Sequence, residues 1–243
     1  RPGCSMKQVI AMHGWCGDAS AWRPWAYQFK NHGWHWQSGE RGYGGASPIT
    51  PQWQTEATEQ FQSRRVVIGH SLGPHLLSSS LLAEATDVVL LASFARFLPE
   101  GAQGRALRAG LQGMQERLGT KEESAMLHSF LNRAAQPHSA SDLPPSPIQQ
   151  SLSVDGRQRL QADLKLLINT KGLPDGLPEQ ARILIVEADQ DAIVVPAARA
   201  ELIDALQHHL NQTPTQWKLA NVGHALVLPD LIKRVRVWIE SSP

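Results

Sequence analysis

Cysteine, long apolar runs and an excess of either charge are what this sequence lacks. Its 243 residues include two cysteines, and 23 Lys and Arg residues stand against 22 Asp and Glu residues, for a formal net charge of +1. Two cysteines are too few for a disulfide-stapled scaffold, and the near-neutral charge lacks the basic footprint of a nucleic-acid-binding protein. No apolar run approaches the ~20 residues of a membrane-spanning helix. We therefore expect a cytoplasmic protein without disulfides that binds neither nucleic acid nor membrane.

The N-terminal residues look foreign to the rest of the chain. Arg1 to Ser5 precede Met6, and we expect them to be a remnant that does not belong to the native protein. Cys4 would then not be native, Cys16 is expected to be a free thiol, and no signal peptide is recognised.

Short apolar segments alternate with helical ones along most of the chain. We expect strands at 7–12, 33–37, 65–69, 88–93, 182–188 and 214–219, and helices near 20–31, 52–62, 72–85, 196–209 and 229–240. This β/α alternation predicts an α/β fold with a mostly parallel sheet flanked by helices on both faces. With 42% hydrophobic residues, the length suits a single domain over residues 1–243.

The alternation breaks over residues 97–177, where no strand is evident. Amphipathic helices are predicted at Arg105–Leu118, Lys121–Ala135 and Val154–Ile168, around a connector rich in proline and serine, Gln136 to Ser151. The insertion lies between two predicted strands whose ends meet at one edge of the sheet. We expect it to form a helical cap over a site at that edge.

The most informative segment runs from Arg65 to Gly73. A β-branched run leads into Gly69-His70-Ser71-Leu72-Gly73, and a helix-forming segment follows. A serine on a sharp strand-to-helix turn needs small residues two positions away on either side, and Gly69 and Gly73 supply them. The helix is expected to aim unpaired N–H groups at an anion formed beside Ser71. The pattern predicts that Ser71 is a nucleophile.

A nucleophilic serine needs a base and an acid that orients the base, in the chain order Ser, acid, His for a nucleophile elbow. A buried strand ending near Ala188 leads into a loop with three candidate acids, Glu187, Asp189 and Asp191. His224 follows another short strand, and it is the one histidine at a strand-to-loop junction downstream of these acids. His224 is therefore predicted to be the base. Other histidines are expected to be surface or packing residues: His32, His35, His128, His138, His208 and His209.

These motifs together resemble the α/β-hydrolase superfamily, which implies the α/β-hydrolase fold. Within it the chain is similar to the pimeloyl-acyl carrier protein methyl ester carboxylesterases of biotin synthesis. The closer likeness lies in His-Gly-Trp followed by Ala19-Ser20-Ala21-Trp22, in Leu90-Leu91-Ala92-Ser93 and in Ser129-Phe130-Leu131. The superfamily likeness covers nearly the whole chain and rests on His13-Gly14-Trp15, the Gly-rich stretch Gly39 to Ser47, Gly69 to Gly73, Asp191 and Gly223-His224.

The resemblance also implies roles for further residues. The spacing of Asp191 to the apolar pair and proline that follow it is similar to the family loop, so Asp191 is the expected triad acid and Asp189 the alternative. The amide of Trp15, after His-Gly, is the expected oxyanion donor together with the amide of Leu72. Two departures from the family pattern are the missing opening β-hairpin and Gly73-Pro74 in place of Gly-Gly.

The cap sequence bears on substrate choice. Apolar residues at helical spacing either line an acyl channel or pack the cap onto the body, and Phe130 is the one we favour as substrate-binding. Basic residues either receive an acidic acyl carrier protein or belong to a solvated face balanced by Glu116, Glu122, Glu123, Asp155 and Asp163. The apolar residues are Leu107, Leu111, Met114, Leu118, Met126, Leu127, Phe130 and Leu131, and the basic ones are Arg105, Arg108, Arg117, Lys121, Arg133, Arg157, Arg159, Lys165 and Lys171.

The sequence as a whole predicts a serine carboxylesterase that works through an acyl-enzyme, without cofactor or metal, as a monomer. The resemblance implies the methyl ester of pimeloyl-acyl carrier protein as substrate. One alternative is a general short- or medium-chain esterase or a C–C bond hydrolase, which would share the same triad. The alternative from another class is a catalytically silent binding protein with a hydrolase fold.

Overall fold

The strand-forming segments assemble into one sheet. The structure is a computed structural model, and it describes residues 6–55, 63–147 and 151–241. The described strands lie in the order β2-β1-β3-β4-β5-β6, and every neighbouring pair is parallel. All six expected strands are found, as β1 (Lys7–Met12), β2 (His35–Ser38), β3 (Arg64–His70), β4 (Asp87–Leu91), β5 (Arg182–Ala188) and β6 (Thr215–Leu219).

The chain order reverses at β1, which lies between β2 and β3. Loops that leave neighbouring strands in opposite directions open a crevice at the carboxyl ends of the strands, and this is where parallel α/β sheets bind ligands. The loops that follow β1 and β3 carry Trp15 and Ser71, so the predicted oxyanion loop and nucleophile start at the same crevice.

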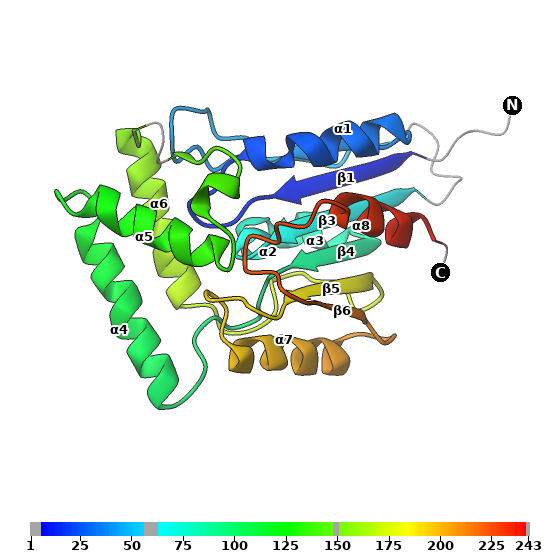
Figure 1. The fold of residues 1–243 in the computed structure, drawn as a ribbon. Helices are drawn as coiled ribbons and strands as arrows, with labels where there is room; N and C mark the ends of the chain where they lie inside the picture. Colours follow the sequence, from blue (N-terminus) through cyan, green and yellow to red (C-terminus); the bar gives the residue numbers. More distant parts are fainter. Residues whose placement is uncertain (1–5, 56–62, 148–150, 242–243) are drawn as a thin grey trace, which may run out of the picture.

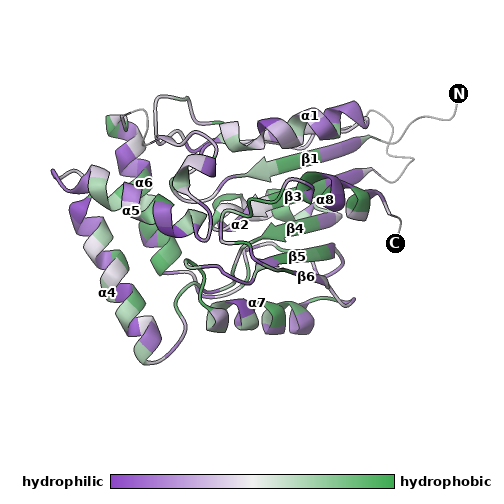
Figure 2. Ribbon diagram, in the orientation of Figure 1, coloured by the Kyte–Doolittle hydropathy of each residue, from purple (hydrophilic) through white to green (hydrophobic). Residues whose placement is uncertain are grey.

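Alternation along the strands divides the core between two faces. In β1, Val9 and Ala11 pack against α1 (Arg23–Asn31) and α8 (Leu231–Glu240), whereas Ile10 and Met12 belong to the cluster on the opposite face. That opposite face is covered by α2 (Gly73–Leu76), α3 (Ser79–Ala83) and α7 (Pro196–His209). A short 3-10 helix, η1 (Ala19–Trp22), precedes α1. Helices therefore cover both faces, as predicted (Figure 1), and the strands between them are largely hydrophobic (Figure 2).

The expectation of one helix over 72–85 is wrong. The segment forms α2 and α3, which are separated by Leu77 and Ser78, because the Ser78 hydroxyl starts a new helix by accepting a hydrogen bond from the Leu81 amide at 3.2 Å. The helix beside Ser71 thus has four residues, too few for a substantial helix dipole. Most of the helix expected over 52–62 lies outside the described residues, and residues 51–55 are not helical.

The insertion between β4 and β5 forms helices and no strand in its described parts. It contains α4 (Ala102–Arg117), α5 (Glu123–Ala135), the 3-10 helix η2 (Ala140–Asp142) and α6 (Val154–Ile168). The three long helices match the predicted ranges to within three residues. They stand together at the end of the sheet to which the arrows of the strands point (Figure 1). Residues 97–177 are called the cap below.

Helix α6 anchors the cap to the body. The buried Asp163 carboxylate accepts two hydrogen bonds from the Arg41 guanidinium, at 2.7 and 2.8 Å, and one from the Tyr43 hydroxyl at 2.6 Å. In addition, the Trp15 indole donates to the Leu160 carbonyl at 2.8 Å. Helix α4 is attached differently, since Gly104 and Met114 are its only buried residues.

Candidate active site

Ser71 sits on the sharp turn that the Gly-x-Ser-x-Gly pattern predicts. Its φ is 56°, in the left-handed region, where a residue with a Cβ costs roughly 1–2 kcal/mol. Two hydrogen bonds hold this conformation: the Ser71 amide donates to the Leu91 carbonyl at 2.9 Å, and the Ser93 hydroxyl donates to the Ser71 carbonyl at 2.7 Å. The end of β4 therefore supports the turn that follows β3.

The two glycines of the pattern are required by close approach of neighbouring atoms. A Cβ at Gly69 would lie 2.4 Å from the Pro74 side chain, and a Cβ at Gly73 would lie 2.4 Å from the Met12 carbonyl oxygen. Pro74 thus fits in the first turn of α2 because Gly69 leaves room for its ring. Gly73 lets the turn lie directly against the end of β1.

His224 and Asp191 are brought together from separate loops. The His224 Nδ1 donates to the Asp191 Oδ2 at 2.9 Å, and both side chains are buried. The other carboxylate oxygen of Asp191 accepts from the amides of Ile193 and Val194, each at 2.8 Å. This arrangement leaves the Nε2 of His224 as the ring nitrogen that can accept a proton.

The same contacts set the ionisation of Asp191. Burial opposes the charged form, but the charge and hydrogen bond of His224 and the two amide donors outweigh it, so the pKa of Asp191 is lowered. The other candidate acids lie elsewhere. Asp189 is exposed and forms no hydrogen bond or ion pair with His224, and Glu187 is buried in β5, where burial raises its pKa.

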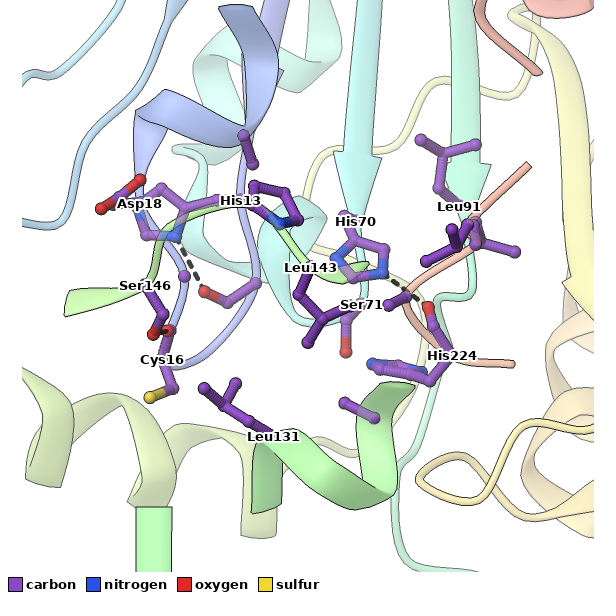
Figure 3. A pocket seen from close by; sticks show the side chains of 18 of the residues that line it. His13, Cys16, Asp18, His70, Ser71, Leu91, Leu131, Leu143, Ser146 and His224 are labelled. Carbon is purple, nitrogen blue, oxygen red and sulfur yellow. Dashed lines mark hydrogen bonds between the residues drawn. The ribbon is translucent and has the colours of Figure 1, made fainter. Parts of the chain in front are cut away.

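His70 joins the turn of Ser71 to the loop of His224, a contact that the sequence did not predict. Its Nε2 donates to the His224 carbonyl at 2.9 Å, and the two ring centroids are 5.1 Å apart (Figure 3). Burial and the neighbouring His224 lower the pKa of His70 to about 4. His70 is therefore neutral at pH 7 and acts as a hydrogen-bond donor.

The cap holds the same loop from the other side. The amide of Ala225 donates to the Ala134 carbonyl at the end of α5, at 3.0 Å. A Cβ at Gly223 would lie 1.6 Å from the Gln136 carbonyl oxygen, so the loop passes directly against the chain that leaves α5. His224 is thus fixed between the body, through His70, and the cap.

The loop after β1 lies directly against Ser71. A Cβ at Gly14 would be 3.0 Å from the Cβ of Ser71. Cys16 has a φ of 64°, and the Gly17 amide donates to the Gly14 carbonyl at 3.1 Å, so the loop turns sharply after Trp15. Among the described residues, the amides of Trp15 and Leu72 donate to no protein acceptor.

A buried carboxylate behind this loop was also missed at the sequence level. Glu40 accepts from the amides of Ala19 at 3.0 Å and Gly42 at 2.8 Å, and it lies 3.3 Å from the Nε2 of His13. Burial opposes its charge, but these partners prevail and lower the pKa of Glu40 to about 2. Glu40 and His13 therefore hold the loop through hydrogen bonds, and His13 also lines the cavity that contains Ser71.

Two cavities meet at Ser71. A smaller one of about 320 Å³ is lined by Ser71, His70 and His224 (Figure 3), and a larger one of about 670 Å³ extends under the cap. Trp15 and Phe130 line both, and their rings meet edge to face with centroids 5.1 Å apart. The apolar part of the larger cavity is lined by Phe97, Leu107, Leu111, Met114, Met126, Leu164, Leu167 and Ile193.

Other chemistry finds little support in the described residues. None of their His, Cys, Asp and Glu side chains form a group of three or more that could hold a metal ion. Cys16 is a free, buried thiol, and burial raises its pKa to about 12, so it is not a thiolate nucleophile. No helix within the described ranges is both long enough and apolar enough to cross a bilayer.

Known proteins share the shape of this chain rather than its sequence. No protein-family model matches the sequence, and no curated protein matches it significantly. Solved structures do: an esterase from Exiguobacterium antarcticum has a TM-score of 0.65 at 16% identity, covering 98% of this chain and 93% of its own. An esterase from Rhodococcus sp. has a TM-score of 0.63 at 18% identity, covering 97% and 91%.

A third similar structure is itself described as an α/β hydrolase. It is an α/β hydrolase from a Medee basin deep-sea metagenome library, with a TM-score of 0.65 at 15% identity, and it covers 98% of this chain and 90% of its own. The parallel sheet, its flanking helices and near-complete coverage by hydrolase structures agree with the fold predicted from the sequence. The chain has the α/β-hydrolase fold.

Proposed function

We propose that the protein is a serine carboxylesterase. Ser71 attacks the acyl carbon of an ester, while His224 takes the proton of Ser71 and returns it to the departing alcohol. Asp191 holds the imidazole in the tautomer that accepts this proton and stabilises the imidazolium. Water then hydrolyses the acyl-enzyme by the same route and restores Ser71.

One observation carries this proposal. A buried His224–Asp191 pair, 2.9 Å apart, lines the same cavity as a serine held in the left-handed conformation of a nucleophile elbow. The unused amides of Trp15 and Leu72 beside Ser71 add to it. Oriented donors of this kind supply about 3–4 kcal/mol each to the stability of an oxyanion.

The test is covalent labelling together with turnover. We expect a fluorophosphonate to label Ser71 and the protein to hydrolyse p-nitrophenyl butyrate, and we expect Ser71→Ala and His224→Ala to lose at least a thousandfold in rate. Ser129→Ala is the matched control, because Ser129 also lines the larger cavity but lies on α5 rather than on a strand-to-helix turn. Activity of Ser71→Ala within tenfold of the parent would contradict the mechanism, and an unlabelled parent would favour a silent binding protein.

The family resemblance described above narrows the class of expected substrates. We propose a medium-chain acyl ester, with the methyl ester of pimeloyl-acyl carrier protein in biotin synthesis as the specific case. The larger cavity supports an elongated acyl group, because its walls are mostly apolar and it leads from Ser71 to the edge of the cap. Such an enzyme would act in the cytoplasm, as a monomer and without a cofactor.

The charges at the edge of the cap refine the proposed carrier contact. Arg157 is paired with Glu123 at 2.6 Å, and Arg159 donates to the Gly42 carbonyl at 2.9 Å, so both are engaged within the protein. Arg117 and Arg133 are exposed, line the mouth of the larger cavity and form no ion pair with the residues described. We therefore assign docking of an acidic carrier to Arg117 and Arg133.

The carrier proposal is tested by reversing these two charges. The Arg117→Glu, Arg133→Glu variant should have a KM for an acyl carrier protein ester raised about tenfold at low salt, since rim charges set encounter rates. Its kinetics on p-nitrophenyl butyrate should match the parent. Lys121→Glu, on the connection between α4 and α5, is the control. Parent-like kinetics on both substrates would contradict docking at this site.

A further inference from the structure

We propose that the smaller cavity is a leaving-group compartment that admits apolar alcohols much larger than methanol. The protein would then hydrolyse esters of bulky alcohols in addition to methyl esters. This inference rests on the esterase function proposed above and adds to it a second determinant of substrate choice, on the alcohol side of the ester.

The position of His224 assigns the two sides of the ester. The departing alkoxide must receive its proton from the imidazole, so it leaves on the side of Ser71 where His224 lies. His224 lines the smaller cavity and does not line the larger one. The alcohol part therefore lies in the smaller cavity, and the acyl part lies under the cap in the larger one.

The wall between the cavities keeps the two parts separate. Trp15 and Phe130 meet edge to face, and the Trp15 indole is held by its bond to the Leu160 carbonyl at 2.8 Å. Because both rings line both cavities, an ester bound at Ser71 has one half on each side of this pair. A methyl ester would leave the smaller cavity without a substrate group.

The size and lining of the smaller cavity define the alcohol. Its volume of about 320 Å³ is about ten times the ~30 Å³ that one water molecule takes up in the liquid. Trp22, Trp25, Leu131 and Leu143 contribute apolar walls, and Figure 3 shows Leu131 and Leu143 directed toward the space beside Ser71. This space suits a benzyl or similar apolar group.

The polar side chains of the compartment are already engaged within the protein. Asp18 caps η1 by accepting from the Ser20 amide, and Asp142 accepts from the Ser139 amide at 3.2 Å. The Ser146 hydroxyl donates to the Cys16 carbonyl at 3.4 Å. An apolar alcohol therefore enters without breaking these hydrogen bonds or leaving these groups unpaired.

The reaction balances without any further reagent. The Ser71 oxygen forms a bond to the acyl carbon as the bond from that carbon to the alkoxy oxygen breaks. The Ser71 proton passes through His224 to the alkoxide, and the alcohol departs through the smaller cavity. Water then adds to the acyl-enzyme, which releases the carboxylic acid and returns the proton to Ser71.

The experiment varies the alcohol at a fixed acyl group. Methyl and benzyl octanoate are suitable because methanol and benzyl alcohol have nearly equal acidity, so their intrinsic reactivities are similar. We expect the parent kcat/KM for the benzyl ester to exceed that for the methyl ester by at least tenfold. This ratio requires no variant, and a ratio of one or less would overturn the inference.

Two matched variants locate the effect. Leu143→Trp fills the smaller cavity and should bring the benzyl-to-methyl ratio of kcat/KM close to one, because the benzyl ester loses more than the methyl ester. Leu111→Trp fills the larger cavity and should lower kcat/KM for both octanoates, leaving the ratio unchanged. Both positions are half-buried, and circular dichroism checks that each variant folds.

The outcomes separate this inference from the esterase proposal. Hydrolysis of methyl but not benzyl octanoate overturns the leaving-group compartment and leaves the esterase function intact. An equal loss on both esters in Leu143→Trp also overturns it. Failure to hydrolyse any ester, together with an unlabelled Ser71, overturns both.

Discussion

The strand ends and the cap enclose the same site in different ways. On the strand side, Ser71, His224, Asp191 and Glu40 are each fixed by at least two hydrogen bonds or backbone contacts, and close approaches of backbone atoms exclude side chains at Gly69 and Gly73. On the cap side, α6 is bound to the body through Asp163, but α4 buries only Gly104 and Met114.

This difference suggests that the strand side holds the groups proposed to react, whereas the cap side selects the substrate. Reacting groups need fixed geometry, because a displacement of the base or the oxyanion donors removes transition-state stabilisation. The lining of an acyl cavity tolerates exchange of apolar side chains, provided that its volume is kept. Substitutions on the strand side are therefore expected to act on kcat, and those on α4 and α5 on selectivity.

The largest expected effect concerns the two acids after β5. Asp191→Asn should lower kcat by about 10⁴-fold, since the imidazole loses the partner that fixes its tautomer. Asp189→Asn is the matched control, because Asp189 is exposed two residues away, and it should stay within threefold of the parent. Steady-state kinetics on p-nitrophenyl butyrate measure both. The opposite ranking would move the acid role to Asp189.

The next effect is on the anchor of the cap. Asp163→Ala leaves the Arg41 guanidinium and the Tyr43 hydroxyl without their shared acceptor, and we expect the free energy of unfolding to fall by about 3 kcal/mol. Asp155→Ala, exposed on the same helix, should cost less than about 1 kcal/mol. Urea unfolding measures both. Equal costs would mean that the anchor contributes nothing to stability.

A smaller effect is expected at His70. His70→Phe keeps a ring but removes the donor to the His224 carbonyl, and kcat should fall about tenfold with KM unchanged. His70→Gln retains an N–H donor and should recover part of the loss. A change in KM alone, or equal losses in the two variants, would show that this hydrogen bond does not position the base.

His70 also makes stability depend on pH. Its pKa in the folded protein is about 4, below the ordinary value of 6.5, so the unfolded chain binds the proton more readily. The stabilising contribution is complete above pH 6.5 and is lost as the pH falls toward 4, by at most about 2 kcal/mol at pH 5. Urea unfolding at pH 7 and pH 5 should show this loss in the parent and a smaller loss in His70→Gln.

The smallest expected effect lies on the cap side. Phe130→Ala opens the wall between the two cavities, and the preference for octanoyl over butyryl esters should change by about threefold to tenfold. The kcat for p-nitrophenyl acetate should stay within threefold. His128→Ala, exposed on the same helix, is the control and should change neither. A large fall in kcat on every ester would mean that the cap also positions the reacting groups.

Local patterns were sufficient to predict several elements of both the sheet and the cap. The ranges of β1, β5, α7 and the cap helix α6 match the structure residue for residue, because short apolar runs, proline and serine caps mark their ends. The roles of Ser71 and His224 are predicted from strand-to-loop junctions and chain order. The geometry then places Asp191, rather than Asp189, against His224.

The contacts that the sequence did not predict join residues that lie far apart along the chain. Asp163 meets Arg41 across 122 positions, and His70 meets the His224 carbonyl across 154, so no local pattern reports either contact. The same holds for Arg157 and Arg159 of the cap. Their contacts with Glu123 and with the Gly42 carbonyl decide whether they are free to bind a partner. The break between α2 and α3 is different, because Ser78 before Leu81 is a helix-capping signal that is visible in the local sequence.

The contact between the end of α5 and the loop of His224 sets a rule for protein engineering. A chimera that grafts the insertion of another hydrolase between β4 and β5 would replace Ala134 and Gln136, whose carbonyls meet Ala225 and Gly223. Such a transplant would disturb His224, the proposed general base, even if Ser71, Asp191 and His224 were all retained. The exchanged segment should therefore begin after Gln136. The chimera then keeps the native carbonyls that hold the loop of His224.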